Sequence, residues 1–140
     1  MKKIILFISI FGAIYCNSIN EKTKSMKKMD GYLNMYWDND SGKLWLEISD
    51  FDQEFLYVNS LMAGMGSNDV GLDRGQLGNS RIVYFHRIGP KVLLIQPNYR
   101  YRANTDDMKE KSSVADGFAK SAIWGFKVAE EENGKVLVDA

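Results

Sequence analysis

The chain has 140 residues, of which 45% are hydrophobic and 26% are charged, and its 18 basic and 18 acidic residues balance to a formal net charge of zero. This composition is typical of one globular domain of modest size, and a neutral chain lacks the overall field that draws a protein to nucleic acid or to an anionic membrane. One histidine and one cysteine are too few for a zinc site or a histidine-based catalytic triad within this chain.

Residues 1–18 have the pattern of a secretory signal peptide. Two lysines follow the first methionine, and residues 4–15 form an apolar run that is shorter than the about twenty residues of a membrane-spanning helix. Small residues from Cys16 to Ser18 favour cleavage there, so we expect an exported protein (periplasmic, outer-membrane-associated or secreted) with no membrane span after cleavage. A lipoprotein acylated at Cys16 is the alternative, but Tyr15 stands where such a signal normally has a small residue.

Residues 19–29 are polar and rich in lysine, without a sustained period, and we expect an extended tether that leads into one domain over residues 30–140. From Tyr32 to Ile48 apolar and polar residues alternate around residues 38–42, which predicts a hairpin. The acidic turn differs from an EF-hand loop, because glycine is fifth in it instead of sixth. We therefore interpret it as a turn and not as a metal site.

Further strands are predicted at residues 55–58, 81–88, 92–95, 123–126 and 135–138, with a turn at Gly89-Pro90. A helix is predicted at residues 112–121, where Ser113 and Asp116 have the spacing of a capping box. Its apolar residues recur at helical spacing and predict a buried stripe of Val114, Ala115, Phe118, Ala119 and Ala122.

Together these patterns predict a mainly β (α+β) fold, with antiparallel hairpins in a meander and one helix near residues 112–121. The predicted core includes Leu46, Val58, Val83, Phe85, Leu94 and Phe118.

A loop at residues 63–80 with five glycines separates the predicted strands. Loops of this length are usually functional or disordered, and the apolar residues Met65, Val70, Leu72 and Leu77 predict an ordered loop that is anchored to a core. The candidate ordering or binding residues are Asn68, Asp69, Asp73, Arg74 and Gln76. Carboxylates such as those of Asp69 and Asp73 bind calcium in other proteins, but we favour hydrogen bonds of Asp73, Arg74 and Gln76 within the loop. No catalytic residue and no metal ligand is assigned.

Two other features have a functional and a structural interpretation. His86 lies among apolar and aromatic residues, and because acid–base catalysis needs a partner within reach and the sequence indicates none, we favour a half-buried histidine bonded to backbone or tyrosine. Arg100 and Arg102 alternate with Tyr99 and Tyr101, as in proteins that bind single-stranded nucleic acid. With no net charge and an export signal, we expect a solvated strand edge there and no nucleic-acid partner.

Several segments carry a resemblance that covers most of residues 30–140. They are residues 66–69, 71–78, 81–83, 89–94, 96–98, 118–121, 124–126 and 136–140. Together they resemble the N-terminal region of a family of large exported bacterial zinc-dependent metalloproteases, in which a domain of unknown function precedes a metzincin-like catalytic domain.

The resemblance implies a parent protein that hydrolyses peptide bonds with a zinc-activated water in a downstream catalytic domain. In that family the zinc ligands and the general base lie on an H-E-x-x-H-x-x-G-x-x-H helix, and no segment of this chain matches it. We therefore expect the non-catalytic, C-terminally truncated front part of such a protein, with no cofactor of its own. Its partners would be the downstream domain and a peptide or protein substrate.

The alternative is a free-standing exported β-rich binding module that holds a ligand with residues 63–80.

Overall fold

The computed structural model of the chain describes residues 18–64, 66 and 68–140. The predicted signal peptide and Cys16 therefore lie outside the described residues, except for Ser18. The described part is mostly β, with eight antiparallel strands in one sheet, two α-helices and a short 3-10 helix, which confirms the predicted fold class. Neither α-helix in this part has the length and apolar character that crossing a bilayer requires.

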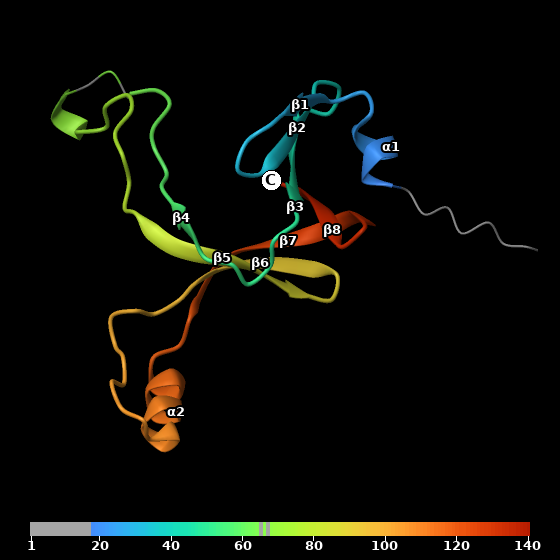
Figure 1. Cartoon of the computed structure of the whole chain (residues 1–140). Coiled ribbons are helices and arrows are strands. Elements are labelled where there is room, and N and C mark those ends of the chain that lie inside the picture. Colours follow the sequence, from blue (N-terminus) through green and yellow to red (C-terminus); the bar gives the residue numbers. More distant parts are fainter. Residues whose placement is uncertain (1–17, 65, 67) are drawn as a thin grey trace, which may run out of the picture.

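The elements in chain order are α1 (Ile19–Thr23), β1 (Lys27–Met29), β2 (Asn34–Asp38), β3 (Lys43–Ile48), β4 (Phe55–Tyr57), η1 (Asn68–Val70), β5 (Arg81–Ile88), β6 (Lys91–Gln96), α2 (Met108–Gly117), β7 (Ser121–Glu132) and β8 (Lys135–Asp139). The strand order in the sheet is β1-β2-β3-β8-β7-β6-β5-β4. The chain thus makes two meanders that join where β8 pairs with β3 (Figure 1).

The sheet is curled. Ile48 of β3 and Phe85 of β5 belong to one buried cluster, although β8, β7 and β6 lie between these strands in hydrogen-bonding order. The connection from β3 to β4 crosses the resulting gap, and the backbone N–H of Asp52 donates to the carbonyl of Phe85 at 2.8 Å. The other buried members of the cluster are Val83, Val92, Leu94, Val136 and Val138.

A second, smaller cluster covers the opposite face of the sheet. It contains Ile19, Tyr36, Trp45 and Leu137. Leu137 lies between Val136 and Val138 in β8, and successive side chains of a strand point to opposite faces. The sheet is therefore covered on both faces around β3 and β8.

The segment 19–29 differs from the predicted extended tether, because it forms α1 and β1. The hydroxyl of Ser18 accepts a hydrogen bond from the N–H of Glu21 at 3.2 Å, an N-cap that satisfies one of the donors at the helix start. Ile19 is 3% exposed. Its burial depends on Tyr36, Trp45 and Leu137, which are distant in sequence, so the local pattern of residues gave no sign of it.

The turns follow local chemistry. The β2–β3 hairpin is confirmed, with Tyr36 opposite Trp45, and the Asp38 carboxylate accepts from the N–H groups of Asp40 and Ser41 at 3.0 and 3.4 Å. The β5–β6 turn is confirmed as well, with Gly89 at φ 54°. Aspartate and glycine are among the residues that such turns favour.

The predicted core is right at Val83, Phe85 and Leu94, and Leu46 packs against the same cluster. Val58 and Phe118 are each 40% exposed, so their assignment to the core was wrong. β4 ends at Tyr57, which leaves Val58 in the following loop.

The predicted helix exists but is displaced. α2 begins four residues earlier than predicted, because the Asp107 carboxylate caps it by accepting from the N–H of Lys109 at 2.8 Å. The spacing of Ser113 and Asp116 is therefore not used as a cap. The helix has no buried residue, so the expectation of a buried stripe was also wrong.

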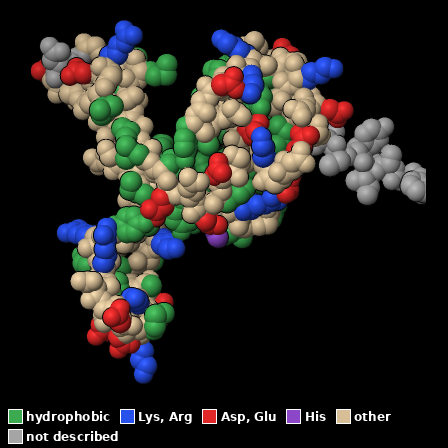
Figure 2. Space-filling view, viewed as in Figure 1, with side chains coloured by type: hydrophobic (Ala, Val, Ile, Leu, Met, Phe, Trp, Pro, Cys, Tyr) green, Lys and Arg blue, Asp and Glu red, His purple; other side chains and the backbone are tan. Residues whose placement is uncertain are grey.

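The inner face of the curled sheet is open at its centre, where hydrophobic side chains gather (Figure 2). They surround a hollow of about 620 Å³. Its lining comes from both meanders: Leu33, Leu44, Leu46, Phe55, Tyr57, Phe85, Leu94, Ile123, Trp124, Phe126 and Ala140. We call this surface the concave apolar face.

Candidate functional site

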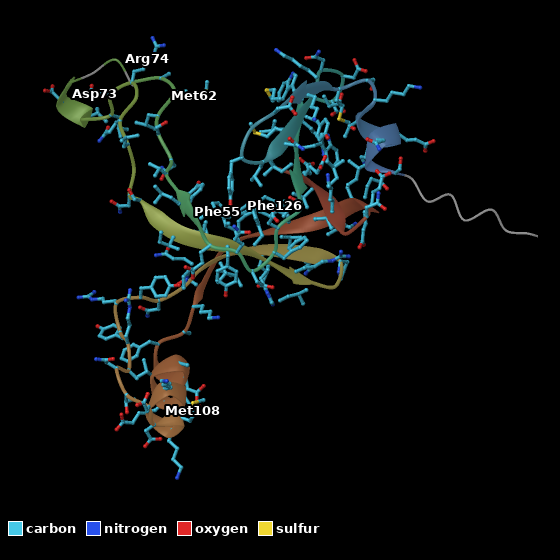
Figure 3. All side chains as sticks on the ribbon, in the orientation of Figure 1. Phe55, Met62, Asp73, Arg74, Met108 and Phe126 are labelled. Carbon is cyan, nitrogen blue, oxygen red and sulfur yellow. The ribbon has the colours of Figure 1, made fainter. Side chains whose placement is uncertain are left out.

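The glycine-rich loop projects away from the edge of the sheet between β4 and β5 (Figure 1). Its base continues the hairpin, because Ser60 pairs with Leu77 and the N–H of Gly78 donates to the carbonyl of Asn59 at 2.7 Å. Asp73 and Arg74 lie at its far end, and Met62 lies along it (Figure 3).

The structure brings two of the five candidate loop residues into contact. The side-chain oxygen of Gln76 accepts from the N–H of Asp73 at 3.2 Å, and the N–H of Gln76 donates to the carbonyl of Asp73 at 3.1 Å. Asn68 and Asp69 lie apart in η1. Neither the carboxylates of Asp69 and Asp73 nor the guanidinium of Arg74 makes an ion pair within the described ranges.

No metal site is assembled from the described residues. They contain no group of three or more histidine, cysteine, aspartate and glutamate side chains that could hold a metal ion. The described part of the chain therefore does not fit a zinc centre.

The predicted anchoring of the loop to a core was wrong for three of its four apolar residues. Val70 is 53% exposed, Leu72 38% and Leu77 72%, and Met65 lies outside the described residues. Met62 is 92% exposed as well. The physical reason is the position of the loop, which extends beyond the sheet edge, where no second layer covers it (Figure 1).

His86 has a partner that sequence analysis missed. Its Nδ1 lies 2.6 Å from the carboxylate of Asp52, and its side chain is 41% exposed. Asp52 belongs to the β3–β4 connection and has a positive φ of 59°. The two residues are 34 positions apart and meet because the sheet curls, so no local signal in the sequence could have paired them.

A second projection, residues 97–120, leaves the sheet between β6 and β7 and carries α2 (Figure 1). At its base two hollows of about 480 and 490 Å³ adjoin each other. Pro97, Asn98 and Tyr99 line both. The first is also lined by Ser80, Arg81, Ile82, Gln96, Arg100 and Ser121, and the second by Tyr101, Arg102, Lys111, Val114, Ala115, Phe118 and Lys120. We call the two hollows together the tyrosine–arginine groove.

Aromatic and basic side chains hold this groove in shape. The rings of Tyr101 and Phe118 stack at 3.9 Å with an interplanar angle of 13°. The guanidinium of Arg102 lies 4.9 Å above the Tyr99 ring, a cation–π contact. The Tyr99 hydroxyl donates to the Glu54 carboxylate, which raises the pKa of Tyr99. Residues 98–107 form no strand, so the expected strand edge is instead a loop that lines a groove.

Two family models match adjacent parts of the chain. One, described as a domain of unknown function (DUF5118), matches residues 17–64, and the other, described as a domain of unknown function (DUF5117), matches residues 75–140. No curated protein and no solved structure matches the chain. The first match contains α1 and β1 to β4, and the second contains β5 to β8. The two matches follow one another along the chain, and residues 65–74 between them lie in the glycine-rich loop.

Proposed function

We propose that this chain is a non-catalytic accessory part of an exported zinc-dependent metallopeptidase. In this proposal a catalytic domain downstream in the same polypeptide hydrolyses peptide bonds with a zinc-activated water. The resemblance of most of residues 30–140 to the N-terminal region of such proteases supports the parentage. A catalytic zinc takes about three protein ligands, and the single histidine of this chain supports a non-catalytic role.

The concave apolar face is the observation that carries the accessory role. Its aromatic and aliphatic residues come from both meanders, and Trp124 within it is 63% exposed. An exposed apolar surface of this kind is typical of a surface that another protein part covers. We expect the catalytic domain to pack on it.

The test compares the 140-residue chain with the chain extended along its reading frame. A fluorogenic peptide should be cleaved only by the extended protein, and a chelator should abolish that cleavage. Replacing Phe126 with Asp on the concave apolar face should reduce activity of the extended protein, whereas replacing the exposed Val70 with Asp should not. Chelator-sensitive cleavage by the 140-residue chain itself would falsify the proposal.

A second candidate is a free-standing exported module that binds a ligand with the glycine-rich loop. The exposure of Leu77 on that loop and of Met62 directly before it favours it. A stop codon directly after Ala140 in the gene, together with loss of ligand binding in the Met62→Ser variant, would favour the free-standing module over the accessory part of a protease.

A further inference from the structure

The tyrosine–arginine groove concentrates positive charge. Among the described residues, five basic side chains and no acidic side chain line the two hollows. The five are Arg81, Arg100, Arg102, Lys111 and Lys120. None of them makes an ion pair with another residue of the described ranges, whereas Lys22, Arg87 and Lys135 do. In a chain whose charges balance, this local excess favours a ligand that carries negative charges.

The same groove has an apolar wall on α2. Lys111, Val114 and Ala115 have the spacing i, i+3 and i+4 that places them on one face of α2, and Phe118, which follows the helix as its C-cap, lines the same hollow. Of the stripe predicted from the sequence, Val114 and Ala115 lie in α2 and Phe118 follows at its C-terminal cap, and these three line an open groove instead of a core. A matching ligand has apolar groups next to its negative charges.

The arrangement of the aromatic rings does not favour the binding of nucleic-acid bases. Single strands bind by stacking successive bases on free aromatic faces. Here Tyr101 and Phe118 stack on each other, and Arg102 covers one face of Tyr99. The rings therefore serve as walls and supports, and a polypeptide with carboxylates and apolar side chains suits the groove better than a polynucleotide.

We propose that the tyrosine–arginine groove binds an acidic polypeptide segment in an extended conformation. Carboxylates of the segment pair with Arg100, Arg102 and Lys111, and its apolar side chains pack against Val114 and Phe118. Side-chain amides of Gln96 and Asn98 in the lining supply donors and acceptors for the peptide backbone. This inference does not rest on the proposed function, because it applies to an accessory part and to a free-standing module alike.

The experiment is a fluorescence-anisotropy titration of the full chain. The probe is a labelled peptide in which glutamate alternates with leucine, and its counterpart has glutamine in place of glutamate. We expect the glutamate peptide to bind at least about tenfold more tightly, because each exposed ion pair contributes up to about fivefold. Raising the salt concentration from about 50 mM to about 500 mM should weaken binding, because salt screens exposed charges.

Two variants with the same change in net charge test the location of the site. The triple change R100Q/R102Q/K111Q should weaken the glutamate peptide about tenfold or more. The matched control K27Q/K91Q/K127Q removes three exposed lysines on β1, β6 and β7 and should leave its affinity unchanged. Phe118→Ala should weaken the leucine-containing peptide while the thermal unfolding of the chain stays cooperative.

Each opposite result overturns the proposal. Equal affinity for the glutamine peptide would exclude recognition of carboxylates, and unchanged affinity of the R100Q/R102Q/K111Q variant would exclude this groove. An equal loss of affinity for the glutamate peptide in the control variant would show that the effect comes from net charge and not from this groove. Tighter binding of an oligothymidylate of the same charge would assign the groove to single-stranded nucleic acid.

Discussion

At the scale of single residues, Glu47 is a buried carboxylate with several donors around it. It is 8% exposed, and it accepts from the Tyr36 hydroxyl at 2.6 Å and from Lys135 Nζ at 2.9 Å. Burial on its own would raise the pKa of Glu47, but the hydrogen bonds from Tyr36, Lys135 and Asn34 and the charge of Lys135 hold that pKa below its ordinary value of 4.5. Burial and the neighbouring Glu47 raise the pKa of Tyr36 from 10.0 to about 12.

These shifts predict how the stability of the fold depends on pH. A lowered carboxyl pKa stabilises the fold above the unfolded value, so the contribution of Glu47 is lost as the pH falls through its folded pKa, below 4.5. A raised tyrosine pKa stabilises the fold below the unfolded value, so the contribution of Tyr36 is lost as the pH rises from 10.0 towards 12. Urea unfolding across this range should show a plateau with a fall on each side.

Tyr36→Phe isolates the alkaline part of this profile. It should lower the free energy of unfolding at neutral pH by about 2 kcal/mol, because a buried hydrogen bond to a charged group is lost, and it should flatten the fall above pH 10. Tyr32→Phe is the control, since Tyr32 is 71% exposed. An unchanged alkaline fall in the Tyr36→Phe variant would contradict the assignment.

At the scale of elements, the glycine-rich loop behaves as an appendage of the β4–β5 hairpin. Its described hydrogen bonds stay within residues 59–78, such as those of Leu61 with Gly75 and Gln76, and its apolar side chains are exposed. Replacing residues 62–74 with Asn-Gly should therefore change the free energy of unfolding by no more than about 1 kcal/mol, because closing a shorter loop costs slightly less entropy.

Thermal unfolding of the shortened chain distinguishes a loop that adds little to stability from the ordered, hydrogen-bonded loop predicted from the sequence. If Asp73 and Arg74 hold an ordered loop that supports the fold, both the shortened chain and the Asp73→Ala variant should be destabilised, by about 1–3 kcal/mol for each buried polar group left without a partner. Unchanged thermal unfolding midpoints for both variants, together with loss of binding to a partner or ligand, would show that the loop serves in binding.

The elements that sequence analysis placed correctly are those whose signal is local. Alternation with a period of two and turn residues such as Asp38 and Gly89 predicted the hairpins, because both act within a few residues. α1 was missed, since the burial of Ile19 depends on Leu137 more than a hundred positions away. The start of α2 was misplaced because the helix is capped by Asp107, upstream of the Ser113 and Asp116 pair from which its start was predicted.

The candidate site was less predictable for the same reason. The Tyr99–Arg102 pattern was visible, but Arg81 of β5, Lys111 of α2 and Lys120, which directly precedes β7, line the same groove. The pairing of His86 with Asp52 likewise needs the curl of the sheet. Local sequence patterns can identify single residues, but a site contains residues from several elements, and tertiary packing brings those elements together.

At the scale of the whole molecule, the two matched family segments share one sheet. β4 of the first segment pairs with β5 of the second, and β3 of the first pairs with β8 of the second. The larger buried cluster also mixes them, since Ile48 belongs to the first and Val83, Val92 and Val136 to the second. The two matched segments therefore contribute to one sheet and to one buried cluster.

This arrangement predicts complementation between fragments. Residues 18–64 and 75–140, expressed separately, should each lack a cooperative thermal transition, because each exposes the apolar residues that the other covers. Mixed together, they should regain strand signal in circular dichroism and form a complex of one copy each, since the cut falls in a loop that adds few contacts to the sheet. Replacing Ile48 with Asp in the first fragment should abolish the complex, and replacing the exposed Lys27 with Asp should not. A cooperative transition in either fragment alone would show that the family boundary also separates two folding units.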